Sequence, residues 1–300
     1  MKKAIILGLF AVACGAIAPQ AAAQKFAIKG YDNIGLGNSM KVEKTDDGQT
    51  SKSNFNAFGL DFGYTFWRKG GNSLEANIGF GYTSASAKIG IGDMSYHYSA
   101  PAYADEDGNP YERYYELTDL KQKASLGYLT VPIYLDYQYK PIKWLGLHAM
   151  VGVGLGFGLD STISTGDVTG TAKAWGVFPE YDDLLIDEDY LDDFGVRNLA
   201  GRGSGKPDAN KFAANLICGA GLEFYTYEPV SFEIGVRYNY GFTNAFKGKY
   251  EAPQNGTFTA ETAPVTYTVA EGTQVRSLTD YTGGGRLQSL SLHLGINVRF

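Results

Sequence analysis

Apolar and polar residues alternate along most of this chain with a period of two, which is the pattern of β-strands with one apolar face. The C-terminal run is strict and continues to the last residue. Its apolar positions are Leu290, Leu292, Leu294, Ile296, Val298 and Phe300. Seven earlier runs repeat the pattern, and the first is the least regular because Asp32 interrupts its apolar face. These runs lie at about 26–42, 55–68, 73–87, 125–140, 145–161, 212–227 and 230–246.

The length of the runs and of the links between them indicates how the strands are arranged. Each run exceeds the roughly 9–11 residues that a tilted strand needs to cross a bilayer. Short links alternate with long ones, as in transmembrane barrels with short periplasmic turns and long outer loops. We therefore predict an all-β fold, a closed antiparallel up-and-down transmembrane β-barrel of about eight strands. The short links lie at 69–72, 141–144 and 228–229, and the four predicted extracellular loops at about 43–54, 88–124, 162–211 and 247–286.

The N-terminal residues have the features of a secretory signal. Lys2 and Lys3 precede an apolar segment at 4–18, and small residues follow at 21–23. We predict a cleaved signal peptide at 1–24, a barrel at 25–300 and a location in the cell outer membrane. A lipoprotein signal ending at Cys14 is the alternative, although a strong lipobox would have Leu in place of Ala11.

A sheet in hydrocarbon must close on itself, because each backbone N–H and C=O needs a partner there. The apolar faces then contact lipid and the polar faces point into the lumen. Charged lumen residues are expected to pair, since an unpaired buried charge is costly. We expect Arg237 and Arg299 to lie near Glu223 and Glu233. The predicted lumen network is Asp61, Glu75, Asp136, His148, Glu223, Glu233, Arg237, His293 and Arg299, and Lys29 and Asp160 also fall on the inward face.

Composition excludes several classes of protein. The net charge is −6, and loss of the two lysines with the signal makes it −8, which argues against a nucleic-acid partner. After the signal no apolar stretch approaches the roughly 20 residues of a membrane helix. The 39 glycines and 22 tyrosines suit barrel walls and aromatic girdles. Only Cys218 remains in the mature chain, so no internal disulfide is expected.

Few residues suggest chemistry. Ser291 and His293 share a face, but that face is the lumen, and we interpret them as polar filling. His97, alone among tyrosines, is weak evidence for a metal or catalysis. The acidic segment 180–193 is interpreted as a solvated loop, with Ca²⁺ binding or bridging to lipopolysaccharide as the alternative. Glycines at 152, 154, 156 and 158 follow a strand period and do not form a dinucleotide fingerprint. We expect no enzyme activity, metal or other cofactor.

Two segments carry a resemblance to known proteins. The segment 128–137, YLTVPIYLDY, resembles a strand of the PorT-like outer-membrane β-barrel family of Bacteroidetes, and the glycine-rich run at 152–160 is similar to that family's next strand. The resemblance implies an outer-membrane location and no known cofactor. A terminal Phe300 resembles the closing strand that the barrel-assembly machinery recognises, so it is the predicted membrane-assembly signal.

The leading hypothesis for function is an integral outer-membrane barrel with a structural, adhesion or binding role through its surface loops. Its partners would be outer-membrane lipid and lipopolysaccharide, the barrel-assembly machinery, and a surface protein or glycan. The alternatives are a narrow channel for small solutes, an accessory component of protein secretion, and an enzyme that modifies outer-membrane lipid.

Overall fold

The computed structural model describes residues 25–37, 40–43, 50–104, 107–159, 163–181, 184–186, 195–202, 209–227, 229–247, 256–258 and 278–300. These residues form fifteen strands and two short 3₁₀ helices. Among them no helix is long and apolar enough to span a membrane. The predicted signal peptide, including Cys14, lies outside the described residues, as does Asp160.

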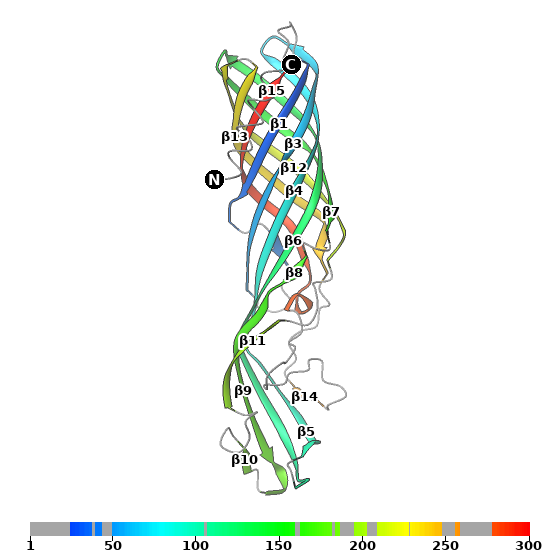
Figure 1. Ribbon diagram of the computed structural model, residues 1–300, viewed down its shortest axis with the longest axis vertical. Helices are drawn as coiled ribbons and strands as arrows, with labels where there is room; N and C mark the ends of the chain where they lie inside the picture. Colours follow the sequence, from blue (N-terminus) through cyan, green and yellow to red (C-terminus); the bar gives the residue numbers. More distant parts are fainter. Residues whose placement is uncertain are drawn as a thin grey trace.

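Eight strands pair antiparallel in a closed ring, each with two neighbours (Figure 1). The order around the ring is β1-β3-β4-β6-β7-β12-β13-β15, and β15 pairs again with β1. Closure gives every strand a partner on both sides, which is what a sheet in lipid requires. The prediction of an all-β antiparallel barrel is confirmed. The ring strands are β1 (Phe26–Gly35), β3 (Thr50–Lys69), β4 (Asn72–Ile91), β6 (Pro110–Ile142), β7 (Leu145–Gly158), β12 (Phe212–Tyr227), β13 (Val230–Phe246) and β15 (Gly285–Arg299).

The outer surface of the ring has an apolar band. On β4 the outward positions run from Leu74 to Tyr82, and Ile78 and Phe80 are more than half exposed. Nine residues of a tilted strand rise about 20–25 Å, which matches the apolar band of membrane barrels. Large exposed apolar residues lie at matching positions on the other ring strands, including Phe62, Ile133, Leu135, Val151, Val153, Ile234, Val236, Leu290 and Leu294.

We call the end of the barrel with the short links the turn end, and the opposite end the loop end. Toward the loop end the polarity of the wall is inverted. On β4 the outward residues become Ser84, Ser86 and Lys88, while the inward residues Ala85, Ala87 and Ile89 are buried. A wall with apolar residues inside and polar residues outside is suited to water. The barrel therefore continues past the apolar band as a sheet with its own core.

The strand β6 carries this sheet far beyond the ring, since it is 33 residues long, whereas β4 ends opposite Leu120 of β6 (Figure 1). Beyond the ring, β6 pairs with β5 and β9, and β9 pairs with β10 and β11. The shorter strands are β2 (Met40–Val42), β5 (Met94–Ala104), β8 (Ser164–Thr165), β9 (Asp167–Phe178), β10 (Leu184–Ile186), β11 (Gly195–Arg202) and β14 (Gly256–Phe258), and the 3₁₀ helices are η2 (Pro179–Tyr181) and η3 (Leu278–Tyr281).

Each of the four ranges expected to be a loop therefore contains strand. The difference between the expected loop and the observed strands is largest at 88–124, where β4 ends, β5 follows and β6 begins. The range 162–211 holds β8 to β11, the range 247–286 holds β14, η3 and the start of β15, and the range 43–54 holds the start of β3. On β4 and β6 the physical reason is the inversion of polarity, since past the apolar band their buried residues include apolar ones such as Ile89 and Leu126, on the face that is polar within the band.

Candidate functional site

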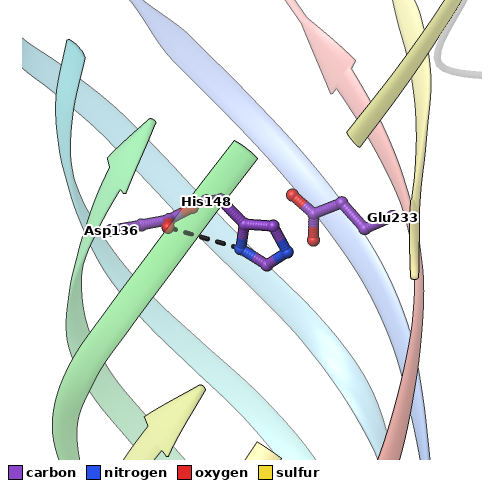
Figure 2. Close-up of side chains that lie close together, drawn as sticks. All are labelled: Asp136, His148 and Glu233. Carbon is purple, nitrogen blue, oxygen red and sulfur yellow. Dashed lines mark ion pairs between the residues drawn. The ribbon is translucent and has the colours of Figure 1, made fainter. Parts of the chain in front are cut away.

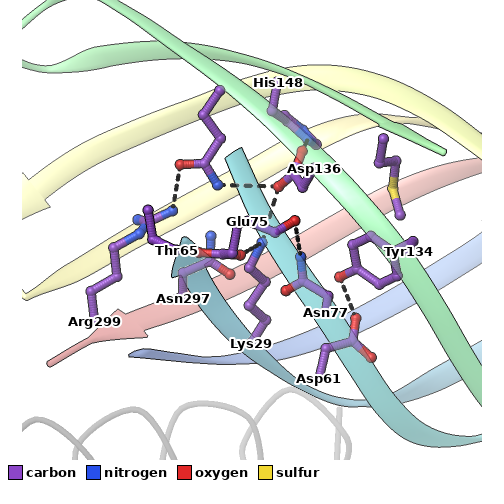
Figure 3. A network of polar contacts seen from close by, with 12 residues as sticks. Lys29, Asp61, Thr65, Glu75, Asn77, Tyr134, Asp136, His148, Asn297 and Arg299 are labelled. Carbon is purple, nitrogen blue, oxygen red and sulfur yellow. Dashed lines mark hydrogen bonds and ion pairs between the residues drawn. The ribbon is translucent and has the colours of Figure 1, made fainter. Parts of the chain in front are cut away.

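The lumen near the turn end is filled by charged side chains, which we call the polar plug (Figure 3). Every member is at most 7% exposed, so the charges are shielded from solvent by the wall and by one another. Burial of this kind is stable only when partners satisfy the charges. The members are Lys29, Asp61, Glu75, Asp136, His148, Glu223, Glu233, Arg237, His293 and Arg299.

Arg299 and Glu223 form a two-point ion pair next to the turn end. The two guanidinium Nη atoms of Arg299 donate to the two carboxylate oxygens of Glu223, one of them at 3.1 Å. Arg299 also donates to Ser231 Oγ at 3.0 Å and to Gln138 Oε1 at 3.2 Å. Tyr225 donates its hydroxyl to Glu223 at 2.8 Å. A planar guanidinium suits such a fork, because its N–H groups match the spacing of carboxylate oxygens.

Lys29 is the cation at the centre of the polar plug. Its Nζ lies 2.6 Å from Glu75 Oε1, 3.0 Å from Asp136 Oδ2 and 4.0 Å from Glu233 Oε1. These carboxylates come from β4, β6 and β13, so one ammonium group connects β1 to both sides of the barrel. Asn297 donates to Glu233 Oε1 at 2.6 Å and completes the contacts of that oxygen.

Arg237 lies deeper in the lumen, among aromatic rings. Its guanidinium carbon is 5.0 Å from the ring centre of Tyr31 and 5.6 Å from that of Tyr134. Tyr134 donates its hydroxyl to Asp61 at 2.6 Å. Cations stack on the negative faces of aromatic rings, which explains how Arg237 is accommodated. The expected pairing of Arg299 with Glu223 is present, whereas no described carboxylate forms an ion pair with Arg237.

Each of the two lumen histidines lies beside at least one carboxylate. His148 Nδ1 is 3.5 Å from Asp136 Oδ1, and the ring extends toward Glu233 (Figure 2). His293 has Nε2 3.4 Å from Glu233 Oε2 and Nδ1 2.7 Å from Asn33 Oδ1. Ser291, which shares a face with His293, donates instead to the backbone oxygen of Arg237 at 3.0 Å. The serine hydroxyl is thus directed away from a catalytic arrangement with His293.

Inward glycines make room for these side chains. A Cβ on Gly79 would lie 1.8 Å from Asp61 Oδ1, and one on Gly221 would lie 2.5 Å from His148 Nε2. A Cβ on Gly152 would lie 2.1 Å from the backbone oxygen of Ile133 and 2.4 Å from the Cα of Tyr134. Glycine is therefore required where the wall meets a bulky inward neighbour.

The loop-end part of the lumen is filled by an apolar core. Tyr128 and Leu126 of β6 pack there with Phe246 of β13 and Leu287 of β15. Leu278 of η3 is fully buried in the same cluster, and its N–H donates to Gln122 Oε1 at 2.7 Å. The helix η3 therefore closes the barrel from the loop end, while the polar plug fills the turn end.

Sequence reasoning located most of these residues but missed some of their partners. All nine residues of the predicted lumen network, and Lys29, are buried in the lumen. Tyr31 was not singled out, because nothing in the alternation distinguishes an inward tyrosine from a lipid-facing one. His97 pairs with Tyr114 in the β5–β6 ladder, far from the polar plug. Of the acidic segment 180–193, the described residues are 180–181 and 184–186, so the carboxylates from Asp182 to Asp193 lie outside them.

Phe300 lies at the rim of the turn end. It is 40% exposed, and its ring stacks on Phe26 with 6.3 Å between ring centres. Its backbone N–H donates to the oxygen of Phe26 at 2.9 Å, so Phe300 pairs with the start of β1 across the β1–β15 seam.

A comparison with known families agrees with this architecture. Residues 22–247 match the family described as "Outer membrane protein beta-barrel domain". The chain belongs to this family. No curated protein sequence matches the chain. The family places the chain among outer-membrane proteins and does not specify a ligand or a reaction.

Three solved barrels are similar to this outer-membrane protein over nearly their full length. OprG from Pseudomonas aeruginosa is 12% identical, with a TM-score of 0.43 over 93% of this chain and 96% of that one. Ail, the attachment invasion locus protein of Yersinia pestis, is 12% identical, with a TM-score of 0.30 over 93% and 100%. Neisserial surface protein A is 9% identical, with a TM-score of 0.32 over 94% and 100%.

Proposed function

We propose that this outer-membrane barrel is a non-enzymatic anchor that presents the sheet of β5, β6, β9, β10 and β11 at the cell surface for binding or adhesion. The observation that carries the proposal is that the lumen is filled at both ends while the strands continue beyond the apolar band. With short links in the periplasm, as is usual for such barrels, the loop end faces outward.

The filled lumen argues against a channel. The ion pairs of Lys29 and Arg299 cross the turn end, and η3 occupies the loop end. Between them a cavity of about 40 Å³ borders Arg237 and Pro132, which is room for water rather than for a solute. Small barrels of eight strands have interiors that side chains fill.

The sheet of β5, β6, β9, β10 and β11, which we call the outward sheet, offers a surface suited to sugars or protein side chains. Tyr114 of β6 stacks on Trp175 of β9, with ring centres 5.5 Å apart and planes inclined by 12°. The ammonium of Lys173 lies 5.0 Å from the centre of the Trp175 ring. Flat aromatic faces beside a cation are common in binding surfaces, because they combine apolar area with polar contacts.

Several finer features belong to this proposal. Cleavage of the signal at 1–24 would release a mature chain that begins near Gln24 or Lys25. The resemblance of 128–137 supports a place in the PorT-like branch of Bacteroidetes, and the exposed rim position of Phe300 supports recognition by the barrel-assembly machinery. The burial of Ser291 and His293 supports the absence of a lipid-modifying activity.

Binding by intact cells tests the outward sheet. Cells that display the wild type should bind at least one component of a panel of glycans and extracellular-matrix proteins. We expect Trp175→Ala to weaken that binding at least tenfold. Trp144→Ala is the matched control, because Trp144 is an exposed tryptophan at the turn end and its loss should leave binding unchanged. Equal binding by wild-type and Trp175→Ala cells would contradict the proposal.

Two further measurements separate the alternatives. The purified mature protein should give no stepwise conductance in planar bilayers, and reproducible steps would favour a narrow channel. After mild solubilisation it should sediment without stoichiometric partners, and a stable complex with secretion components would favour an accessory role in protein secretion.

A further inference from the structure

His148 occupies a position between two carboxylates that come from different parts of the barrel wall. Asp136 is on β6, His148 on the neighbouring β7 and Glu233 on β13, and Figure 2 shows the imidazole between the two acids. Each side chain is at most 4% exposed. One potential ligand atom from each residue lies within 4.8 Å of the other two, in the only such group of metal-ligating side chains within the described ranges.

Among the described residues, two of the three side chains in this group carry buried atoms without a hydrogen-bond partner, whereas both oxygens of Glu233 have partners in Asn297 and His293. Within the described part of the chain, neither nitrogen of His148 nor Oδ1 of Asp136 makes a hydrogen bond. The separation of 3.5 Å between His148 Nδ1 and Asp136 Oδ1 is too long for a good one. Buried polar atoms are almost always satisfied, so three such atoms together indicate a missing partner.

The balance of charge in the polar plug indicates what kind of partner is missing. Among its described members, five carboxylates face three permanent cations, which leaves two negative charges unbalanced when both histidines are neutral. Lys29 is engaged by Glu75 at 2.6 Å and by the other oxygen of Asp136 at 3.0 Å. One divalent cation would supply both missing positive charges.

We propose that Asp136, His148 and Glu233 bind a divalent transition-metal ion of the zinc class inside the lumen. One imidazole nitrogen and two carboxylate oxygens are a donor set that suits Zn²⁺, whose bonds to such atoms are about 2.0–2.2 Å long. In a tetrahedral site with such bonds the ligand atoms lie roughly 3.4 Å apart, so metal binding would draw together ligand atoms that lie within 4.8 Å of one another.

The surroundings of the three ligands fit this role. His293 Nε2 lies 3.4 Å from Glu233 Oε2 and orients that carboxylate from outside the site. Gly221 faces His148 Nε2 at a distance that leaves no room for a side chain, so glycine at this position keeps the space beside the nitrogen open. The metal would join β6 and β7 to β13 across the lumen and stabilise the closed barrel.

Metal content after refolding tests the site directly. The untagged mature chain is refolded in detergent with ZnCl₂, passed through a desalting column, and its zinc is measured by mass spectrometry. We expect about one zinc per chain in the wild type and less than about 0.2 in His148→Gln and Asp136→Asn, as for a site that loses a ligand. His97→Gln is the matched control, because it removes a histidine of the outward sheet and should retain the zinc.

Wild-type measurements decide the question if the variants fail to fold. Zinc should raise the unfolding temperature of the wild type, and EDTA present during refolding should remove the increase, since a ligand of the folded state stabilises it. A wild type that retains less than about 0.2 zinc per chain would overturn the proposal. Equal zinc in the wild type and in a folded His148→Gln variant would also overturn it. In either case, protonated histidines would be left to balance the carboxylates.

Discussion

The ion pair between Arg299 and Glu223 allows a quantitative test of the polar plug. The change is Arg299→Met, which keeps an apolar stem of similar length and removes the guanidinium. Both residues are at most 7% exposed, and a cavity of about 170 Å³ at the turn end borders Arg299 but not Glu223. Glu223 would keep the hydroxyl donors Ser231 and Tyr225 and the amide of Asn297. The substitution therefore leaves a carboxylate that is hydrogen-bonded but has lost its nearest cation.

The expected cost follows from these contacts. Removal of one partner of a buried ion pair costs about 3–5 kcal/mol, and the three remaining donors place this case near 3 kcal/mol. In the double variant Arg299→Met with Glu223→Gln, both charges are gone and the cost should fall to about 1–2 kcal/mol. The coupling between the two positions is then at least about 1 kcal/mol, which is well above the scatter for independent sites.

The assay is equilibrium urea unfolding of the refolded mature chain in detergent micelles, followed by tryptophan fluorescence and by the heat-modifiable shift on gels. Refolding of purified protein avoids any effect of the variant on assembly in cells. Lys121→Met is the matched control, because Lys121 forms an exposed pair with Asp119 at 2.6 Å and its loss should cost less than about 1 kcal/mol. An Arg299→Met variant within 1 kcal/mol of the wild type, or strictly additive costs in the double variant, would refute the reasoning.

Three further predictions concern the wall of the barrel. Ile78→Arg places a charge in the middle of the apolar band and should lower the free energy of unfolding by about 2–4 kcal/mol, measured with urea in lipid vesicles. Ser86→Arg lies beyond the band and should lower it by at most about 1 kcal/mol. Equal losses for the two variants would show that the band does not end between these positions. Gly152→Ala should lower the free energy of unfolding by about 1–3 kcal/mol in the same assay, because its Cβ would overlap the neighbouring backbone. An unchanged free energy of unfolding would show that the neighbouring strand shifts to make room for the methyl group. Deletion of Phe300 should slow barrel assembly in cells, measured as the heat-modifiable fraction over time, and leave refolding in detergent unchanged; a refolding defect instead would indicate a structural role.

The membrane strands were predictable because lipid imposes a simple rule on them. Every second residue of a ring strand must be apolar over the height of the band, and the other residues are free to be polar. That rule identifies residues such as Ile78 and Ile234 as outward and Glu75 and Glu233 as inward. The same rule gives the antiparallel order, because the links at the turn end are too short for any other connection.

The outward sheet was not predictable by that rule. At Ser84 to Ile89 the alternation continues, but the apolar residues move from the outward positions to the inward ones. A search for apolar residues on the lipid face therefore ends at the band and assigns the remainder to loops. The change of phase is present in the sequence, and it marks where the wall passes from lipid to water.

The partners within the polar plug depend on strand register and on the curvature of the wall, and the alternation of apolar and polar residues does not reveal either. Lys29 contacts Glu75 and Asp136, which lie on β4 and β6, separated from β1 by one and two ring strands. Arg237 was expected near a carboxylate and instead stacks on tyrosines, because Tyr31 and Tyr134 project into the lumen at its level. Alternation assigns a side chain to the inner or the outer face of the wall, but closure of the ring decides which inward side chains contact one another across the lumen.

The lumen holds the polar plug inside the apolar band and an apolar core beyond it, and this difference follows from whether lipid or water surrounds the wall. Inside the band the outer face is apolar, so a lumen that was also apolar would make the strands hydrophobic on both faces before insertion. Charged inward residues keep these strands alternating, and their ion pairs then satisfy one another once the ring closes. Past the band the outer face is polar, and an apolar core can hold the wall together in water. Each level of the wall thus has an interior suited to its surroundings, and we predict that substitutions on the exposed face of the outward sheet leave the fold of the barrel unchanged.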